Sequence, residues 1–596
     1  MYDGCGACVR SVRFRRTESK MKTRREFLQT SLCAGATAML PFNGDASLLG
    51  PESGSAHERP NIVFILADDM GFSDIGCYGS EIETPHLDSL ARGGLRFTDF
   101  HNSPRCCPSR AALLTGMYAQ QAGMGMMTSD HGTYPYPGYA GDLSENCVTV
   151  AEALKAGGYT TLMTGKWHLT PLNVGKHNYP LQRGFDRYYG IINGAASYFD
   201  PATLTRDNEP IDVKELGKDY YLTDAIGDYS AQFIADAAKL DKPFFLYAAF
   251  TAGHWPLMAK EETIAKYKGR YAGGWDKLRA ERHARQLASG IVKAEWGITP
   301  RDPRVPAWER ASFHEWEERR MEVYAAQIDS LDQNIGKIVG KLRELGLLEN
   351  TMICFMSDNG GNYEEIGRIA PGRPHPATMP VETKDGLPVV PGNDPSIMPG
   401  PATTYASYGI PWGNASNTPF RLYKHYAHEG GISTPFIVHW PRGLKSTGLT
   451  HAIGHEIDFM PTCLEIAGVR YPATSKSGTT PPPLEGKSLV PVFAGRGLAD
   501  RALFWEHEGN HAVREGKWKL VSKFPDSWEL YDMEADRTEM HDLAEQYPDR
   551  VKKMVADYAE WLRRAGVQPW PMPETPPSAE REGAMTAPSY LLHDRL

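Results

Sequence analysis

Four short apolar runs, each followed by polar residues, constrain most strongly how this chain can fold. The first, Asn61-Ile-Val-Phe-Ile-Leu-Ala67, is rich in β-branched residues and does not alternate with polar ones, which is typical of a strand buried on both faces of a parallel sheet. Residues 159–164, 243–250 and 351–357 have the same character, and helical patterns at 148–156, 222–240 and 320–345 precede them in turn. This alternation predicts an α/β fold, with a large mixed, mostly parallel sheet flanked by helices.

The remaining patterns predict a smaller C-terminal α+β domain and several further elements. Short strands at 503–506, 511–514, 518–523 and 529–531 indicate an antiparallel meander, which a helix at 547–565 closes. Helices are also expected at 86–93, 109–115 and 455–467, and a strand at 434–440. Residues 267–306 are charged and carry Trp275 and Trp296, so we expect a surface insertion there. Residues 362–419 are rich in Pro, Gly and Asn and are expected to lack regular structure.

The N-terminus resembles a twin-arginine export signal. Arg24 and Arg25 precede an apolar run of small residues at 32–40, which contains a candidate cleavage site at 36–38. We expect export by the twin-arginine machinery to the periplasm or the exterior, with Met21 as the natural start. An arginine pair before a simple linker is the alternative. The run is too short to be a stable membrane anchor, and no other stretch is long and apolar enough to span a bilayer.

Charge and cysteine content exclude some classes of protein. The net charge of −9 over 596 residues leaves no basic surface for nucleic acid, so we expect no such partner. Of nine cysteines, the three at 5, 8 and 33 would be removed with the signal. The other six show no metal-type spacing, and a large exported protein needs no disulfide framework.

Polar side chains follow each of the four apolar strands. Asp68 and Asp69 follow the first strand, and Asp358 and Asn359 follow the last. Lys166 and His168 follow the strand at 159–164, and His254 follows the one at 243–250. Ligands bind at the carboxyl ends of strands in open α/β sheets, so we expect these side chains to converge. The Asp and Asn side chains offer only oxygen ligands, which predicts a site for calcium or magnesium rather than zinc, and we favour one calcium ion.

The stretch from Ser103 to Gly116 carries the most specific motif. Cys106-Cys107-Pro108-Ser109-Arg110, followed by Leu114-Thr115-Gly116, has the pattern C-x-P-S-R-x-x-x-L-T-G. It resembles the signature of the type I sulfatases, in which a maturase oxidises the first cysteine to formylglycine (3-oxoalanine). A buried cysteine pair at a Pro-started turn is the alternative interpretation. Only Cys106 has Pro two and Arg four residues after it, so the resemblance implies modification at Cys106 rather than at Cys107.

Three further motifs extend this resemblance from about residue 60 to residue 566. Gly165-Lys166-Trp167-His168 is similar to a second sulfatase signature, and His254-x-Pro256 to another element of the family. Arg421-x-x-Lys424, followed by Glu429-Gly430-Gly431, is similar to a fourth. Together they imply an alkaline phosphatase-like fold. They also imply calcium held by Asp68, Asp69, Asp358 and Asn359, in contact with the modified Cys106.

The resemblance also implies a role for each site residue in hydrolysing a sulfate monoester to sulfate and an alcohol or phenol. A hydroxyl group of the hydrated aldehyde at Cys106, deprotonated by contact with the metal and Asp358, would attack sulfur, and Arg110 would hold the hydrate. Lys166 and Lys424 would neutralise charge on the sulfuryl oxygens. His254 or Lys424 would protonate the leaving oxygen, and His168 would assist release of sulfate.

These expectations divide the chain into four segments and leave two other functions open. The segments are an N-terminal extension (1–58), a catalytic domain (59–478), the C-terminal α+β domain (479–570) and a Pro-rich tail (571–596). The other functions are phosphomonoester or phosphodiester hydrolysis by the same chemistry, and calcium or glycan binding without catalysis. The loops at 267–312 and 362–419 are expected to select the sulfated small molecule or glycan, and His507 is a further residue that could reach the site.

Overall fold

The computed structural model describes residues 59–129, 134–369, 374–376 and 378–572. The predicted export signal and linker at 1–58 and most of the Pro-rich tail, at 573–596, lie outside the described residues. Within the described ranges, no helix is both long enough and apolar enough to cross a bilayer.

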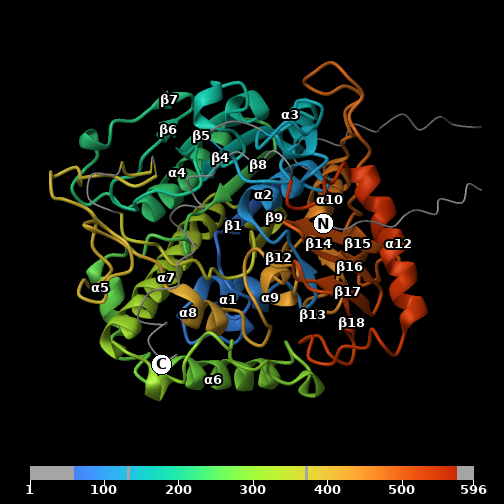
Figure 1. The fold of residues 1–596 in the computed structure, drawn as a ribbon. Coiled ribbons are helices and arrows are strands. Elements are labelled where there is room, and N and C mark those ends of the chain that lie inside the picture. Colours follow the sequence, from blue (N-terminus) through green and yellow to red (C-terminus); the bar gives the residue numbers. More distant parts are fainter. Residues whose placement is uncertain (1–58, 130–133, 370–373, 377, 573–596) are drawn as a thin grey trace, which may run out of the picture. The chain divides into compact units, whose positions relative to one another are not determined.

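A ten-stranded sheet forms the centre of the described chain (Figure 1). Its strands lie in the order β13 (Gly448–Thr450), β2 (Leu95–Phe97), β12 (Phe436–His439), β9 (Thr351–Ser357), β1 (Asn61–Ala67), β8 (Phe244–Ala249), β4 (Thr160–Gly165), β5 (Arg187–Ile191), β6 (Leu204–Arg206) and β7 (Glu209–Pro210). Strands β9, β1, β8, β4 and β5 are parallel, whereas β12, β6 and β7 are antiparallel to their neighbours. The predicted mixed, mostly parallel sheet is therefore confirmed.

Alternate residues of β1 enter two separate hydrophobic cores, because successive side chains of a strand point to opposite faces. Val63, Ile65 and Ala67 contribute to one core, and the even-numbered residues from Ile62 to Leu66 to the other. The first core includes side chains of helices α1 (Pro85–Arg92), α4 (Leu222–Ala237), α6 (Gly274–Ser289), α7 (His314–Glu344) and α8 (Gly409–Ser416). The second includes side chains of α2 (Cys106–Thr115), α3 (Val150–Ala156), α10 (Phe459–Ala467) and α11 (Val490–Phe493).

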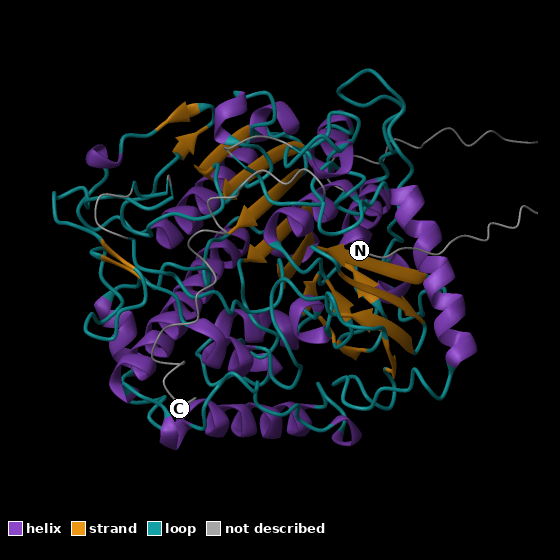
Figure 2. Ribbon diagram, viewed as in Figure 1, coloured by secondary structure: helices purple, strands orange, loops and turns teal. Residues whose placement is uncertain are grey.

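A four-stranded antiparallel sheet follows in the C-terminal part, as predicted. Its strands are β15 (Ala502–His507), β16 (Asn510–Glu515), β17 (Trp518–Ser522) and β18 (Glu529–Asp532). The closing helix α12 (Pro548–Ala565) lies beside this sheet (Figures 1 and 2). Short elements complete the description: β3 (Phe100–His101) pairs with β14 (Gly454–His455), β10 (Val390–Pro391) pairs with β11 (Thr404–Tyr405), and α5 (Glu261–Ile264) and α9 (Glu429–Ile432) are single turns.

Two predictions about long connections were wrong. Residues 267–306 are not a surface insertion, because α6 lies within them and Trp275 and Trp296 belong to the first core. The charged Arg282 of α6 is fully buried and pairs with Asp74 and Glu81. Residues 362–419 are not wholly irregular either, because they contain β10, β11 and the buried helix α8.

Candidate active site

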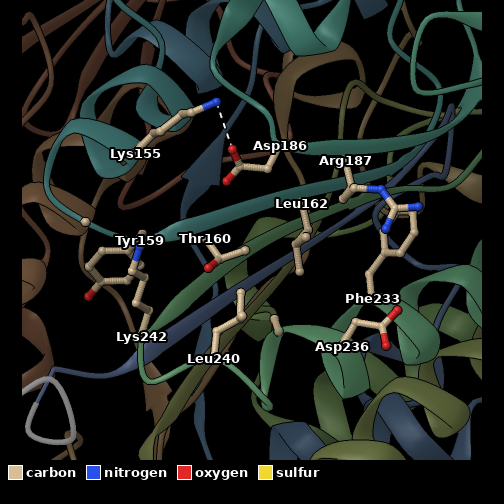
Figure 3. A pocket seen from close by; sticks show the side chains of 12 residues that line it. Lys155, Tyr159, Thr160, Leu162, Asp186, Arg187, Phe233, Asp236, Leu240 and Lys242 are labelled. Atoms are coloured by element: carbon tan, nitrogen blue, oxygen red, sulfur yellow. Dashed lines mark ion pairs between the residues drawn. The ribbon is translucent and has the colours of Figure 1, made fainter.

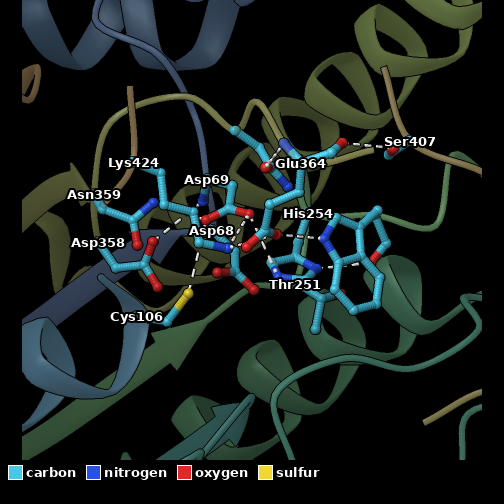
Figure 4. Close-up of polar contacts among 12 residues, drawn as sticks. Asp68, Asp69, Cys106, Thr251, His254, Asp358, Asn359, Glu364, Ser407 and Lys424 are labelled. Atoms are coloured by element: carbon cyan, nitrogen blue, oxygen red, sulfur yellow. Dashed lines mark hydrogen bonds and ion pairs between the residues drawn. The ribbon is translucent and has the colours of Figure 1, made fainter. Parts of the chain in front are cut away.

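The structure brings the polar residues that follow the four central strands into one cluster, and Figure 4 shows those that follow β1, β8 and β9. Strands β9, β1, β8 and β4 are neighbours in that order, so their carboxyl ends lie along one edge of the sheet. This geometry places Asp358 and Asn359 beside Asp69. The Asp69 backbone N–H donates to Asp358 Oδ1 at 3.1 Å, and Asn359 Nδ2 donates to Asp69 Oδ1 at 2.7 Å. All these side chains are fully buried.

Cys106 is the first residue of α2 and reaches the cluster from the second core. Its side chain is fully buried, and Sγ lies 3.7 Å from Asp69 Oδ1. Burial raises the pKa of the thiol well above its usual value. The turn around Cys106 is held by Glu456, which accepts hydrogen bonds from the Ser103 N–H at 2.8 Å and from the hydroxyl of Ser109. The sulfur atom therefore has a fixed position against the carboxylates.

Each aspartate of the cluster has a basic partner. Lys166 Nζ lies 2.8 Å from Asp68 Oδ2, and Lys424 Nζ lies 3.0 Å from Asp69 Oδ2. Arg110 donates to Asp358 Oδ2 through both Nε, at 3.1 Å, and Nη2, at 2.7 Å. The three cations and the three carboxylates form one charge-balanced network with almost no contact with solvent.

The pKa values in this network reflect competition between burial and neighbouring charge. Burial, reinforced by Asp358, raises the pKa of Asp68 well above its usual value. Burial acts in the same direction on Asp358, but Arg110 and Lys166 outweigh it and lower the pKa of that carboxyl to about 2. Burial lowers the pKa of Lys424, yet Asp69 and other groups raise it well above the usual lysine value. Lys424 is therefore protonated.

Both predicted histidines lie at the cluster and are neutral. His254 Nδ1 contacts the Trp255 carbonyl oxygen at 2.7 Å, and Nε2 lies 3.4 Å from Asp69 Oδ2. Burial lowers the pKa of His254 to about 3 and that of His168 well below its usual value. The His168 ring packs against Gly194, where a Cβ atom would lie 2.3 Å from the ring. Its Nδ1 has no hydrogen-bond partner among the described residues.

The donor set fits a hard cation. Asn359 Oδ1 is buried and lacks a hydrogen-bond partner within the part of the chain that the structure describes, although buried polar atoms are normally paired. With one oxygen each from Asp68, Asp69 and Asp358 it would complete an all-oxygen set, which calcium prefers. Asp68, Asp69, Cys106 and His254 also offer ligand atoms within 4.8 Å of one another. Sulfur and nitrogen suit softer ions, so we favour the oxygen set.

A separate pocket of about 540 Å³ lies at the other end of the strands (Figure 3). Thr160 and Leu162 of β4, Phe233 of α4 and Lys242, just before β8, line it. None of the predicted site residues lines this pocket. The candidate catalytic and metal-binding residues thus all lie at the carboxyl ends of the central strands, away from this pocket.

The buried cluster, with one cysteine, one arginine, two lysines and two histidines around three aspartates, is suited to binding a tetrahedral oxyanion beside a nucleophile. The sulfatase family model matches residues 60–469, which include all of these residues. The chain belongs to the sulfatase family. It is thus a sulfate ester hydrolase of the alkaline phosphatase superfamily. A second model, described as the C-terminal part of N-sulphoglucosamine sulphohydrolase, matches residues 420–565.

Characterised and uncharacterised sulfatases resemble the chain over most of its length. It is 33% identical to an uncharacterized sulfatase of Schizosaccharomyces pombe, over 86% of this chain and 94% of that protein. It is also 33% identical to the arylsulfatase of Klebsiella aerogenes, over 76% of this chain and 96% of the relative. Human arylsulfatase A is 30% identical, over 79% of this chain and 76% of that protein.

Two solved structures show the same fold. Ps i-CgsB in complex with k-i-k-neocarrahexaose superposes with a TM-score of 0.61 at 24% identity, over 87% of this chain and 95% of that one. A complex of BT4656 with its substrate D-glucosamine-2-N,6-O-disulfate gives a TM-score of 0.55 at 22% identity, over 85% of this chain and 98% of the other.

Sequence reasoning missed several residues of this sulfatase site. Glu364 lies 3.1 Å from Arg105 Nη2 and 3.2 Å from Lys424 Nζ, and it accepts a hydrogen bond from Trp255 Nε1 at 2.8 Å. It lies in the long 362–419 connection, where no periodicity distinguishes one residue from the next. Glu456, which holds the Cys106 turn, comes from a short turn before α10 and has no local motif. His507, which the sequence did indicate as a residue that could reach the site, lies beside His425, the residue after Lys424, with ring centroids 5.3 Å apart.

Proposed function

We propose that this sulfatase uses formylglycine, derived from Cys106, and one bound calcium ion to hydrolyse sulfate monoesters. The observation that carries the proposal is the position of Cys106 Sγ, 3.7 Å from Asp69 in a closed cluster of carboxylates and cations. Formylglycine at this position would supply a hydrated aldehyde, in which one hydroxyl group attacks sulfur and the other expels sulfate as the aldehyde re-forms. A thiol has no second hydroxyl group, so its sulfated form would have no comparable route of release.

Asp68, Asp69, Asp358 and Asn359 would hold the calcium ion, together with an oxygen of modified Cys106. When bound, calcium would neutralise part of the carboxylate charge and polarise the sulfuryl oxygens. The raised pKa of Asp68 supports this assignment, because it reflects negative charges that are crowded together in a buried place.

Arg110, Lys166 and Lys424 would position the reacting groups and offset their charge. Arg110 is fixed by two hydrogen bonds to Asp358 and by a third, at 3.0 Å, to the Lys166 carbonyl oxygen. It can therefore orient the hydroxyl groups on residue 106 without rearranging. Lys166 and Lys424 point into the same buried space, so charge that develops on the sulfuryl oxygens would meet preorganised cations.

The protonation states of Lys424, His254 and His168 support different roles for these residues in proton transfer. Lys424 is protonated and His254 is neutral, which favours Lys424 as the group that gives a proton to the leaving oxygen, with His254 beside it as a hydrogen-bonding partner. His168 is neutral, and its Nδ1 has no partner in the described chain. It is therefore able to accept a proton as sulfate leaves.

The substrate would be a sulfated small molecule or a sulfated glycan. The relatives include arylsulfatases, and two structural neighbours are complexes with k-i-k-neocarrahexaose and with D-glucosamine-2-N,6-O-disulfate. In this chain Trp255, Glu364 and Arg105 lie next to Lys424. They are the groups that a leaving alcohol or phenol would meet.

Maturation and export are part of the same proposal. A formylglycine-generating maturase would act on Cys106, and the twin-arginine machinery would export the protein to the periplasm or the exterior. Replacing Arg24 and Arg25 by lysine should keep the protein in the cytoplasm while leaving its activity in cell extracts intact. Normal export of this double variant, measured by cell fractionation, would contradict the signal assignment.

The direct test is an activity assay of protein coexpressed with a maturase. We expect sulfate release from p-nitrophenyl sulfate or from a panel of sulfated sugars, and loss of that activity after stringent removal of calcium, with recovery on adding it back. Protein made without the maturase is the matched control and should be inactive. Equal activity in the two preparations, or full activity in metal-free protein, would overturn the mechanism.

A further inference from the structure

A second cluster of ligating side chains lies beside the Lys424 segment, outside the site already described. It consists of His425, His507 and Glu508, whose ligand atoms all lie within 4.8 Å of one another. His425 follows Lys424 in the connection before α9, whereas His507 is the last residue of β15 and Glu508 begins the following turn. The cluster therefore joins the catalytic domain to the C-terminal sheet.

The imidazole rings of this cluster are buried, and several of their nitrogens lack a hydrogen bond of good geometry within the described residues. His507 is fully buried, and its ring nitrogens form no hydrogen bond of good geometry among the described residues, although the Gly125 backbone lies within reach of one of them. His425 is 9% exposed, and its Nδ1, which faces Glu508 Oε2 at 3.5 Å, also forms no hydrogen bond within the described ranges. Buried polar atoms are normally satisfied, so ring nitrogens without a good hydrogen bond, gathered beside one carboxylate, indicate a missing ligand.

Burial disfavours a positive charge on both imidazole rings. Burial lowers the pKa of His425 and that of His507 to about 3 each, and Arg105 contributes in the same direction for both. The backbone of Gly125 acts on His507 in the opposite sense. A neutral imidazole has a free lone pair on one nitrogen, which is the form that coordinates a metal ion. The charge of Arg105 is itself offset by Glu364, at 3.1 Å.

The backbone holds two members of the cluster in an unfavourable conformation. His425 has φ of 88° and Glu508 has φ of 48°, both in the left-handed region that side chains other than glycine seldom adopt. The His425 N–H donates to the Pro104 carbonyl oxygen, which fixes its place beside the Cys106 turn. Strain of this kind is concentrated at binding and catalytic sites, where the surrounding structure enforces it.

We propose that His425, His507 and Glu508 form a second metal site, for a borderline transition-metal ion of the zinc type. Two imidazole nitrogens and one carboxylate oxygen are a ligand set that zinc accepts, with water in the fourth position. The Glu508 side chain is 22% exposed, so the site is open to water on one side. The ligand set differs from the all-oxygen set at Asp68, Asp69, Asp358 and Asn359. Because of this difference, zinc would prefer the second site and calcium the first.

The bound ion would fasten the C-terminal sheet to the segment that carries Lys424. His425 and Lys424 are adjacent in sequence, so fixing one limits the movement of the other. Zinc would therefore stabilise the junction between β15 and the catalytic domain without taking part in the reaction at Cys106.

The test is calorimetric titration of purified, calcium-saturated protein with Zn²⁺ alone, together with metal analysis after dialysis. We expect one zinc ion per chain, a higher melting temperature with zinc, and an affinity at least about 100-fold lower in both His507→Ala and Glu508→Gln. Substitution with Co²⁺ should give the absorption bands of a tetrahedral site in the parent and not in these variants. His511→Ala removes a histidine of the neighbouring strand β16 that lies outside the cluster, and it should bind zinc like the parent.

Two results would overturn the proposal. One is the absence of zinc binding in the folded parent protein. The other is equal zinc affinity and stoichiometry in the parent and in correctly folded Glu508→Gln and His507→Ala, which would place the ion elsewhere. Because Glu508→Gln keeps the size and polarity of the side chain, it tests the site even if His507→Ala does not fold. Calcium content serves as the fold control, and it should stay unchanged in all three variants.

Discussion

At the scale of single residues, the candidate active site is notable for charges that compensate one another without solvent. Lys166, Lys424 and Arg110 are each paired with at least one of three aspartates, and all six side chains are buried. A buried charge without a partner raises the free energy of the folded state. Removal of one member of a pair would therefore leave the other as an uncompensated buried charge. Substitutions here should therefore affect several neighbours at once.

The first residue-scale prediction concerns the two adjacent cysteines. Cys106 Sγ faces Asp69, whereas the Cys107 side chain belongs to the second hydrophobic core. Cys106→Ala should lower kcat/KM by at least about 10⁴-fold, because the nucleophile is lost. Cys107→Ala should remain active and lose only packing. Peptide mass spectrometry of coexpressed protein should find the thiol-to-aldehyde change at position 106, and finding it at position 107 would refute the assignment.

The second residue-scale prediction concerns the calcium ligands. Asp358→Asn removes a negative charge that also holds Arg110. We expect loss of bound calcium and a fall in kcat/KM of at least about 100-fold, since too few charged oxygens remain for a hard cation. Metal analysis checks the first effect. Asp332→Asn is the control: Asp332 is also buried, but it caps α1 through the His86 and Leu87 N–H groups. Equal calcium contents in the parent and in Asp358→Asn would exclude this site.

At the scale of elements, the C-terminal sheet is tied to the catalytic domain by buried ion pairs. Lys519 of β17 lies 2.7 Å from Glu429 of α9 and 2.8 Å from Glu539. Arg537 Nε lies 2.9 Å from the other oxygen of Glu429. Glu429 belongs to the Glu-Gly-Gly motif that follows Lys424, so this network fixes the position of a catalytic segment from the second sheet.

Breaking this network should destabilise the protein strongly. Lys519→Met leaves two buried carboxylates short of a partner and should lower the free energy of unfolding by about 3–5 kcal/mol. Lys553→Met removes an exposed lysine of α12 that pairs with Glu515 and Asp557, and it should cost about 1 kcal/mol or less. Chemical denaturation of the two variants compares these effects. A similar small loss in both would show that the buried network does not hold the sheets together.

Glu506 of β15 should make stability depend on pH. Burial raises its pKa from the usual 4.5 to about 7, although Tyr139 and Gln120 donate hydrogen bonds to it. The folded state thus holds a proton that the unfolded state has already released, so the stability contributed by this group is complete below pH 4.5 and is lost as pH rises to about 7. Glu506→Gln should gain up to about 3 kcal/mol over the parent across this range. Denaturation at pH 5 and pH 8 checks it: a constant difference between the two proteins would contradict the prediction.

At the scale of the whole molecule, the central sheet and its polar edge could be predicted because strand burial and strand ends leave local patterns. The site residues Asp68, Lys166, His254 and Asp358 all follow directly from apolar strands or the turns after them. Helix α6 was mispredicted because charge was taken as a sign of solvent exposure, whereas Arg282 is buried in ion pairs. Glu364 could not be found, because no sequence pattern relates a residue of an irregular connection to the buried cluster, and His507 could be named only as a candidate from the second sheet.

The whole site also predicts a preference for sulfate over phosphate monoesters. If one Ca²⁺ is bound as proposed, it and the three cations Arg110, Lys166 and Lys424, set against three carboxylates, would leave a modest positive charge, which suits a monoanionic sulfate ester better than a nearly dianionic phosphate ester. Among matched p-nitrophenyl sulfate, phosphate and phosphodiester substrates, kcat/KM should be highest for the sulfate. A panel of sulfated sugars must accompany them, because enzymes for glycans can be poor on aryl esters. A phosphoester that exceeds every sulfate tested by a wide margin would establish the alternative activity instead.

The complete burial of Cys106 bears on the order in which modification and folding would take place. A modifying enzyme needs access to the thiol, and the finished fold gives it none, so oxidation at Cys106 would have to precede the closing of α2 onto the sheet. Maturation and folding then compete in time. On the proposed mechanism, a molecule that folded first would be trapped as a stable but inactive form, and the relative speeds of synthesis, modification and folding would set the active fraction of a preparation.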